Sequence, residues 1–330
     1  MSLSIHIGVD RSYQPRKRKN NALNPYEMNN KKNICCIFLY TAFIFFIAQN
    51  TFAQMLISKV KSWGYWLQAP DIQVISKSPY DLMVIDYSFD GTDRRAITSQ
   101  DLEKLHKANK HVLCYLSIGE AESYRFYWKK QWKPGNPQFL EKENPDWEGN
   151  YKVKYWDNQW WETAIKPYLN RILSANFDGV YLDIIDAYYY WSQNNYPLKK
   201  CANQMIDLVC KIRSYVEHQG KSHFTICPQN GLSIIQDASL LARKRYLNAI
   251  NAIGVESLFF NYWSIEDQTY RLHCLKQFHL AKKQIFNIEY IKPDQWLTYQ
   301  NYRLKQNIPI IGYAAHEDRG LKELIIFKPE

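Results

Sequence analysis

The sequence predicts an α/β fold, a single (β/α)8 TIM barrel that follows an N-terminal signal segment. Between residues 63 and 315, short apolar runs alternate with helical stretches eight times without an internal break, which is typical of parallel strands joined by helices. Several of these apolar runs end in an acid or an amide. The alternative is a doubly wound open sheet, but no glycine-rich dinucleotide-binding loop follows the first run.

The fourth apolar run is the most informative stretch of the chain. The turn residues Asp178 and Gly179 precede the sequence Val-Tyr-Leu, and Asp183 stands where this strand should end. β-Branched and aromatic residues favour strands, whereas a carboxylate at a buried strand end is costly unless it is paired or used. A structural role for Asp183, as a cap or a salt-bridge partner, is the alternative.

The first half of the barrel is expected to contain four strands and two helices. The strands are expected at residues 63–68, 80–88, 111–118 and 177–186, and the helices at residues 99–109 and 163–175. Residues 123–160 contain many Tyr and Trp residues and are expected to form a long aromatic loop after the third strand.

The second half continues the same alternation of strands and helices. The strands are expected at residues 223–229, 254–260, 285–291 and 309–315, and the helices at residues 203–219, 238–248, 294–307 and within 264–283. The helix at 203–219 is the clearest of these, because Met205, Val209, Ile212 and Val216 recur at helical spacing.

The N-terminal segment has the features of a secretory signal. Two lysines, Lys31 and Lys32, precede a mostly apolar run over residues 34–48, and a small-residue cleavage site ends at Ala53. The apolar run is shorter than the roughly 20 residues that a membrane-spanning helix needs. We expect cleavage after Ala53; an uncleaved membrane anchor is the alternative.

This segment divides the chain into residues 1–53 and a barrel domain over residues 54–330. Met28 lies just before the signal and is a better placed start than Met1, so residues 1–27 need not be translated. We therefore expect a protein that is secreted, periplasmic or attached to the cell surface. Contact with a membrane is expected only through the signal segment, if it stays uncleaved.

The charge distribution argues against a nucleic-acid partner. The net charge is +10, but half of the excess lies in residues 1–53, and the remainder is spread along the chain. No helix carries a basic stripe, and no nucleic-acid-binding module is recognisable. We expect a monomer whose partner is a polysaccharide substrate.

Polar residues gather at the expected carboxyl ends of the strands, where barrel enzymes hold their active sites. These residues are Asp86, Glu120, Asp183, Gln229, Asn230, Glu256, Glu289 and Tyr313. Each acid alone could be a cap or an ion-pair partner, but no Arg or Lys stands at the same strand ends. The set therefore favours a functional cleft. Clustered carboxylates can bind metals, yet no His accompanies them, and we expect no metal and no cofactor.

Five motifs resemble glycoside hydrolase family 114, the barrel family of endo-α-1,4-polygalactosaminidases and their relatives. They are Val84-Ile85-Asp86-Tyr87, the run from Cys114 to Glu122, the run from Asp178 to Asp183, Gln229-Asn230 and Glu289-Tyr290. The resemblance covers roughly residues 60–320. It implies a secreted or surface hydrolase that cuts galactosamine-containing polysaccharide.

The resemblance also implies the catalytic pair, an Asp that ends strand four and a Glu on strand six. These map onto Asp183 and Glu256, which we assign as nucleophile and acid/base. The expected substrate-binding residues are Asp86, Tyr87, Glu120, Tyr181, Gln229, Asn230, Glu289 and Tyr313.

The residue types fit this chemistry independently of the family. Glycoside hydrolysis needs two carboxyl groups, one of which stays protonated, and crowded acids raise one another's pKa values. An acid-lined cleft also attracts a cationic amino sugar. We predict a gap of about 5–5.5 Å between the carboxyls of Asp183 and Glu256, which corresponds to a retaining mechanism.

Two other classes of function remain open from the sequence. The first is a non-catalytic carbohydrate-binding barrel, although the presence of both Asp183 and Glu256 argues against it. The second is a carboxylate-rich lyase or aldolase that acts on a small substrate. A Schiff-base enzyme of that kind needs a Lys inside a strand, and none of the eight expected strand cores contains one.

Overall fold

The computed structural model describes residues 53–260 and 264–326. Nearly all of the expected signal segment therefore lies outside the described residues. Eight parallel strands overlap the eight expected ones: β1 (Trp63–Trp66), β2 (Leu82–Ile85), β3 (His111–Ser117), β7 (Gly179–Asp183), β8 (Thr225–Pro228), β9 (Ala252–Glu256), β10 (Gln284–Tyr290) and β11 (Ile311–Ala315). The sixth strand, β9, begins and ends earlier than residues 254–260, so residues 257–260 form its exit loop.

The strands form the barrel that the sequence predicts. They pair in parallel in two ladders, β1-β2-β3-β7-β8 and β9-β10-β11. A bridge between Gln229 and Gly254 joins β8 to β9. Between β11 and β1, the indole nitrogen of Trp63 donates a hydrogen bond of 3.0 Å to the carbonyl oxygen of Ile311.

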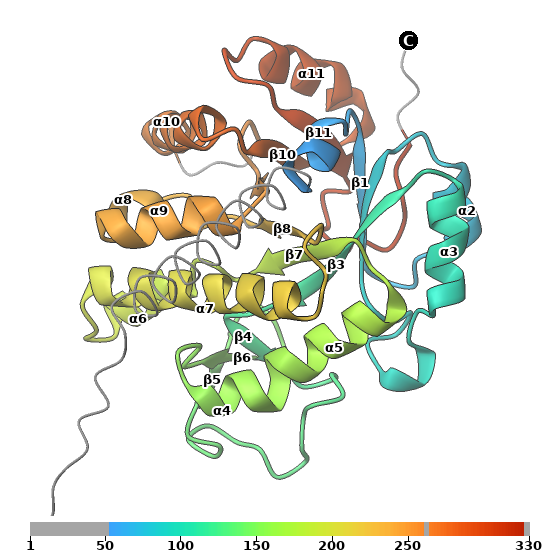
Figure 1. The fold of residues 1–330 in the computed structure, drawn as a ribbon. Coiled ribbons are helices and arrows are strands. Elements are labelled where there is room, and N and C mark those ends of the chain that lie inside the picture. Colours follow the sequence, from blue (N-terminus) through green and yellow to red (C-terminus); the bar gives the residue numbers. More distant parts are fainter. Residues whose placement is uncertain (1–52, 261–263, 327–330) are drawn as a thin grey trace, which may run out of the picture. The chain divides into compact units, whose positions relative to one another are not determined.

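Helices surround the strands in Figure 1. The α-helices are α2 (Ile72–Lys77), α3 (Ser99–Lys107), α4 (Asn158–Trp160), α5 (Lys166–Ala175), α6 (Ala187–Gln193), α7 (Leu198–His218), α8 (Ile234–Asp237), α9 (Leu240–Ala249), α10 (Ile265–Leu280) and α11 (Trp296–Leu304). A π-helical turn, Trp161–Ile165, leads into α5, and short 3-10 turns lie at Asp93–Arg95 and Pro293–Gln295. The helix α7 begins directly after Pro197, five residues before the expected start.

A small antiparallel sheet, missed from the sequence, has one strand directly before the expected aromatic loop and two strands within it. Its strands β4 (Glu120–Glu122), β5 (Leu140–Glu143) and β6 (Asn150–Val153) pair in the order β4-β6-β5. The aromatic rings of this segment pack on one another. The ring centroid of Phe139 lies 5.4 Å from that of Trp132 and 5.4 Å from that of Trp160. Many of the surplus aromatic residues therefore form the core of this subsheet.

Large aromatic rings fill the interior of the barrel. Trp63 lies 6.0 Å from Tyr181 and 5.9 Å from Tyr313 between ring centroids. The ring of Tyr181 reaches across to β9, where a Cβ atom on Gly254 would lie only 2.0 Å from its hydroxyl. Glycine is therefore required at position 254 because of this close approach. The functional site described below therefore lies on top of this packed interior.

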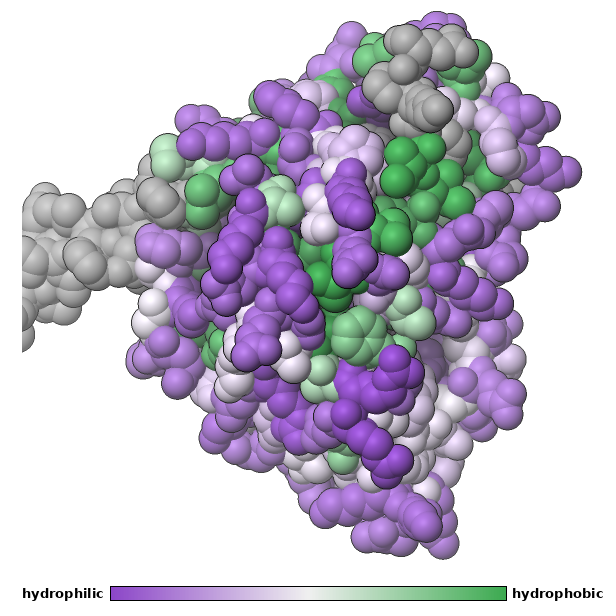
Figure 2. All heavy atoms as spheres, turned by 90° about the vertical axis from the view of Figure 1, so that its right-hand side faces the viewer, coloured by the Kyte–Doolittle hydropathy of each residue, from purple (hydrophilic) through white to green (hydrophobic). Residues whose placement is uncertain are grey.

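The outer surface is mostly hydrophilic on the face shown in Figure 2, where apolar residues gather in a band near the middle. This distribution suits helices such as α3, whose buried residues are Leu102 and Leu105 and whose other residues are mostly charged or polar. Among the described residues, no helix combines the length and apolar character needed to cross a membrane.

Candidate active site

Asp183 ends β7 and faces the cavity at the carboxyl end of the barrel. Its Oδ2 accepts a hydrogen bond of 2.8 Å from the hydroxyl of Tyr115, and its Oδ1 accepts one of 2.8 Å from the amide of Ile184. Burial, followed by the negative charge of Glu256, raises the pKa of Asp183 to about 8. Burial and the neighbouring charge therefore both favour the protonated form of this carboxyl.

Glu256 ends β9 and lines the same cavity. Its Oε2 accepts a hydrogen bond of 2.7 Å from the side-chain amide of Asn230, and its Oε1 accepts one from the hydroxyl of Tyr290. Asn230 also accepts a hydrogen bond of 3.1 Å from the Glu256 amide. Because Asn230 is bonded to both the backbone and the carboxyl of Glu256, it fixes the orientation of that side chain.

The two carboxyls face a cleft made of two adjoining cavities. The first has a volume of about 690 Å³ and contains both Asp183 and Glu256; the second, of about 910 Å³, contains Glu256. The two cavities share seven lining residues: Glu120, Trp147, Ile184, Asp186, Asn230, Glu256 and Arg319. The cleft therefore continues past Glu256 from the first cavity into the second.

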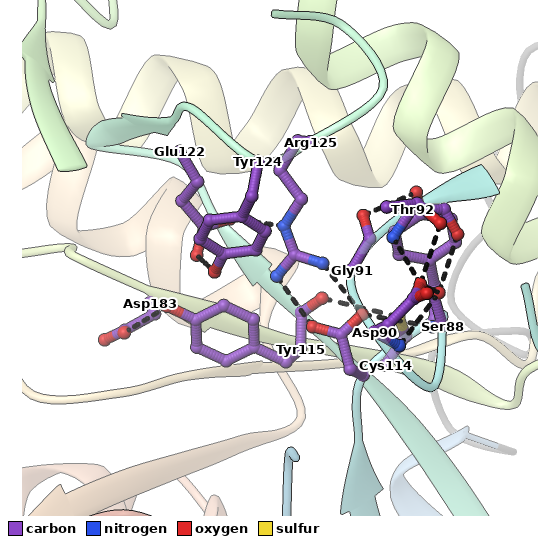
Figure 3. A network of polar contacts seen from close by, with 12 residues as sticks. Ser88, Asp90, Gly91, Thr92, Cys114, Tyr115, Glu122, Tyr124, Arg125 and Asp183 are labelled. Carbon is purple, nitrogen blue, oxygen red and sulfur yellow. Dashed lines mark hydrogen bonds and ion pairs between the residues drawn. The ribbon is translucent and has the colours of Figure 1, made fainter. Parts of the chain in front are cut away.

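One wall of the first cavity is a buried ion-pair network around Arg125 (Figure 3). The guanidinium binds Asp86 through two hydrogen bonds of 2.8 and 2.6 Å, and its Nε donates to Glu122 at 2.8 Å. The Tyr124 ring lies 4.7 Å from the guanidinium, and its hydroxyl donates to Glu122. No Arg or Lys stands at the same barrel-strand ends, but Asp86 is nevertheless paired, because Arg125 reaches it from the segment after β4.

A second cation meets Glu120, which is fully buried in β4. Its Oε1 accepts hydrogen bonds from Lys152 in β6 and, at 3.0 Å, from Asn144. Its Oε2 has no hydrogen-bond partner among the described residues. Lys152 therefore balances the charge of Glu120 but leaves one of its two carboxylate oxygens without a hydrogen-bond donor among the described residues.

Six of the ten predicted site residues line the cleft. They are Asp86, Glu120, Asp183, Gln229, Asn230 and Glu256. The other four predicted binding residues, Tyr87, Tyr181, Glu289 and Tyr313, do not line either cavity. Three of them are tyrosines whose rings are fully or almost fully buried.

These three tyrosines have packing roles instead. Tyr181 lies in the interior of the barrel, beneath the site. Tyr313 is covered by the C-terminal segment, since its hydroxyl accepts a hydrogen bond of 3.1 Å from the amide of Ile325. Tyr87 packs against Tyr168 of α5, with 4.8 Å between the ring centroids. Tyr87 therefore packs toward the helices, whereas Asp86 lines the first cavity.

Glu289 is also turned away from the cleft, because side chains alternate along a strand. In β10, Tyr290 reaches Glu256, so Glu289 faces outward, where it is fully buried. Its carboxylate accepts hydrogen bonds of 2.7, 2.9 and 3.2 Å from three successive amides, those of residues 258–260. Burial raises its pKa to about 7. Glu289 therefore anchors the exit loop of β9 and does not line the cleft.

The same exit loop is held from its other side. Ser257 has a positive φ of 48°, which is uncommon for a residue with a side chain. The guanidinium of Arg271 donates to the carbonyl oxygens of Glu256 and Ser257. Arg271 and Glu289 together keep this strained turn in place directly after the Glu256 side chain.

Several cleft residues were missed by the sequence analysis. Tyr65, Tyr115, Tyr290, Arg125 and Asp186 all line the first cavity. Position along the strand could have identified the tyrosines, because Tyr115 and Tyr290 lie on the inward faces of strands adjacent to Asp183 and Glu256. In the described part of the chain, no group of three or more His, Cys, Asp or Glu residues is arranged to hold a metal ion.

The sequence matches a known family over most of its length. The profile of glycoside-hydrolase family GH114 matches residues 48–317. An uncharacterized protein of Methanocaldococcus jannaschii is 36% identical over 274 residues, which are 79% of this chain and 77% of the relative. An uncharacterized protein of Thermotoga maritima is 33% identical over 316 residues, which are 91% of this chain and 95% of the relative.

Two solved structures share the fold. Aspergillus fumigatus Ega3, crystallised in complex with galactosamine, has a TM-score of 0.59 and 15% identity over 81% of this chain and 95% of that chain. The glycoside hydrolase domain of PelA from Pseudomonas aeruginosa has a TM-score of 0.59 and 12% identity over 80% of this chain and 97% of that chain. These likenesses agree with the barrel described above.

Proposed function

Since this chain belongs to glycoside-hydrolase family GH114, we propose that it hydrolyses galactosamine-containing polysaccharide with Asp183 and Glu256 as its two carboxyls. The family makes it a glycoside hydrolase. The observation that supports the pair is their common cavity, in which the charge of Glu256 raises the pKa of Asp183. The two like charges in one cavity therefore oppose the ionisation of Asp183.

The charge of the cleft supports an amino-sugar substrate. The lining of the first cavity includes eight acidic residues and two arginines, so the cavity favours a cation although the whole chain is basic. The structurally similar Ega3 was crystallised with galactosamine, a sugar that carries a protonated amine. The cleft extends beyond Glu256 into the second cavity, which suits a substrate longer than one sugar.

In the proposed mechanism, the Asp183 carboxylate attacks the anomeric carbon while the Glu256 carboxylic acid protonates the departing oxygen. The bond between that carbon and oxygen breaks, and a glycosyl ester forms on Asp183. Glu256 then removes a proton from water, which hydrolyses the ester and restores both groups. This retaining route corresponds to the expected gap of about 5–5.5 Å between the carboxyls.

The proton must sit on Glu256 when Asp183 attacks. The raised pKa of Asp183 opposes the ionisation that this attack needs. A cationic sugar in this acidic cavity would stabilise the Asp183 carboxylate. Tyr115 also donates to Asp183 Oδ2, which stabilises the charged form of the nucleophile.

The alternative of a Schiff-base lyase receives no support from the eight described barrel strands, because none of them contains a lysine. Lys283, whose pKa burial lowers to about 8, precedes β10 and donates a hydrogen bond of 2.8 Å to the carbonyl oxygen of Ile250. It lies at the amino end of the barrel strands, which is opposite to the cleft.

The experiment that tests this proposal is an incubation of the protein with α-1,4-linked galactosaminan and with neutral glycans. We expect short oligosaccharides from galactosaminan alone, and NMR of the fresh products should show retention of the anomeric configuration. Inverted products would contradict the assignment of Asp183 as nucleophile. Binding of the polymer without any shortening would instead indicate a non-catalytic carbohydrate-binding barrel.

We also propose export, for which the basic and apolar segment before Ala53 remains the supporting feature. The polymeric substrate that we propose would be met outside the cell.

A further inference from the structure

The barrel lacks a strand ladder at one seam, which lies between its last and first strands. The strands pair in the ladders β1-β2-β3-β7-β8 and β9-β10-β11, and the bridge between Gln229 and Gly254 joins β8 to β9. In the described part of the chain, no ladder or bridge joins β11 to β1. A closed barrel needs its first and last strands to be held together, so another segment must hold this seam.

Residues 316–326, which we call the C-terminal strap, lie across this seam. The carbonyl oxygen of Leu321 accepts two hydrogen bonds of 3.1 Å, from the amides of Leu67 and Gln68. These two residues directly follow β1. The middle of the strap is therefore bound to the backbone at the end of β1.

The last part of the strap joins β11 to β1 and to the residues before β2. The amide of Ile325 donates a hydrogen bond of 3.1 Å to the hydroxyl of Tyr313 in β11, and its carbonyl oxygen accepts one of 2.6 Å from the hydroxyl of Tyr80. The side chain of Leu324 packs on β1, where a Cβ atom on Gly64 would lie 2.9 Å from Leu324 Cδ1. The strap thus takes the place of the missing ladder.

Two bends direct the first part of the strap over the mouth of the barrel. Arg319 and Leu321 have φ values of 56° and 46°, which are uncommon for residues with a side chain. Such strain persists only where the surrounding structure enforces it, and it is often found at functional sites. Arg319, Gly320 and Leu321 line the first cavity, and Arg319 also lines the second. The bends therefore place Arg319 where the two cavities adjoin.

The guanidinium of Arg319 contacts two residues that adjoin Glu256. Its carbon lies 5.2 Å from the ring centroid of Tyr290, whose hydroxyl donates a hydrogen bond to Oε1 of Glu256. Its Nη2 donates a hydrogen bond of 3.4 Å to Oγ of Ser257, which directly follows Glu256 in the chain. Because a cation over the face of an aromatic ring is attracted to that ring, Arg319 restrains the ring of Tyr290.

We propose that the C-terminal strap closes the barrel seam and that its Arg319 is a positioning residue for Glu256, which acts by holding the ring of Tyr290. Asn230 donates to Oε2 of Glu256 and Tyr290 donates to Oε1, so the carboxyl keeps its orientation only while the Tyr290 ring stays in place. The inference rests on the proposed function, in which Glu256 is the acid/base. One segment thereby couples closure of the barrel to alignment of the acid/base.

A double-mutant cycle of Arg319→Ala and Tyr290→Phe tests this role in the hydrolysis of galactosaminan. Arg319 is exposed, so its variants should fold. We expect Arg319→Ala to lower kcat about 3- to 10-fold with little change in KM, and Arg319→Lys, which keeps the cation, to restore part of the loss. In the Tyr290→Phe background, which lacks the hydrogen bond to Glu256, Arg319→Ala should lower kcat by less than about 2-fold.

Two surface variants serve as controls for this cycle. Lys322 is exposed on the same strap, and Asp207 pairs with Arg245 away from the cleft, so Lys322→Ala and Asp207→Asn should keep the wild-type kcat. If the losses of Arg319→Ala and Tyr290→Phe multiply in the double variant, Arg319 acts independently of the Tyr290 hydroxyl, and the positioning role is overturned.

The ring-flip rate of Tyr290 tests the same contact without any hydrolysis. It is measured by NMR of protein with isotope-labelled tyrosine, in which Tyr290→Phe identifies the signal. We expect flips about 2- to 5-fold faster in Arg319→Ala and the wild-type rate in Lys322→Ala. If the wild type does not cleave galactosaminan, the proposed hydrolysis fails while the flip rates still decide on Arg319. An unchanged flip rate in Arg319→Ala would overturn its role.

Discussion

The hydroxyl of Tyr115 in β3 donates a hydrogen bond of 2.8 Å to Oδ2 of Asp183 at the end of the neighbouring strand β7. On the other side of the cavity, the hydroxyl of Tyr290 donates to Oε1 of Glu256. Burial, and then the carboxylate that each ring faces, raises the pKa of both hydroxyls well above the ordinary value. Both tyrosines therefore remain neutral donors that orient the carboxyls without cancelling their charges.

The variant Asp183→Asn should lose activity and keep its fold. The change preserves the shape of the side chain but removes the nucleophile, so we expect kcat to fall by at least about 10³-fold, roughly 4 kcal/mol of barrier. Far-ultraviolet circular dichroism should match that of the wild type. A variant that is inactive because it is unfolded would support a structural role for Asp183.

The same variant makes a prediction about stability and pH. The pKa of Asp183 is about 8 in the folded state and about 4 in an unfolded chain, so the raised value favours folding only at low pH. As the pH rises from about 4 to 8, the wild type should lose up to about 1.4 kcal/mol per unit from this group. The melting temperature of Asp183→Asn relative to the wild type should therefore rise over this range. A constant difference between the two proteins would contradict the raised pKa.

The pH dependence of catalysis follows from the raised pKa of Asp183. The mechanism needs one carboxylate and one carboxylic acid, and the proton on Asp183 is lost as the pH passes through about 8. We expect kcat/KM on galactosaminan to fall about tenfold per unit above that pH. A rate that stays constant up to pH 10 would mean that neither carboxyl donates a proton. The amine of the substrate also titrates, so the profile of kcat at saturating substrate serves as the control.

Glu289 should affect catalysis through the exit loop of β9. In Glu289→Gln the side chain can accept from two of the three loop amides, but its new amino group faces the third. We expect a loss of about 1–3 kcal/mol in stability and a lower kcat, because the loop directly follows Glu256. Glu103→Gln, on the exposed side of α3, is the matched control. Wild-type kcat in Glu289→Gln would show that the loop does not position Glu256.

The sequence was sufficient to predict the barrel, because its eight apolar runs recur regularly and each can be recognised from neighbouring residues alone. It also located the acids at the ends of β7 and β9, since strand ends converge in a barrel. It misjudged Glu289 and Tyr290, adjacent residues of which only Tyr290 faces the cleft. A shift of one residue exchanges the side chains that point into the barrel with those that point outward. The apolar runs of a barrel are buried on both sides, so their sequence does not show which side chains point inward.

The sequence could not predict contacts between segments that are far apart in the chain. Arg125 binds Asp86 across 39 positions of the chain, and Lys152 binds Glu120 across 32. Both cations belong to the segment that was expected to be a loop. Its short strands carry no clear alternation of apolar and polar residues, because much of their burial comes from tryptophan and tyrosine rings packed on one another.

Export makes a prediction about the N-terminus. We expect the secreted protein to begin at Gln54, after cleavage at Ala53. The side chain of Gln54 donates a hydrogen bond of 2.7 Å to the carbonyl oxygen of Lys282, and cleavage at this point leaves that contact in place. N-terminal sequencing of exported protein provides the test. Retention of residues 34–48 in the exported form would overturn the assignment of a cleaved signal.

The digestion of galactosaminan by the wild type, Asp183→Asn, Glu256→Gln and the control Asp207→Asn tests the central claim most directly. Chromatographic sizing of the products should show short oligosaccharides with the wild type and the control. Both active-site variants should leave the polymer intact over the same time, with rates at least about 10³-fold lower. An intact polymer with the wild type, or wild-type digestion by Asp183→Asn and Glu256→Gln, would contradict the account.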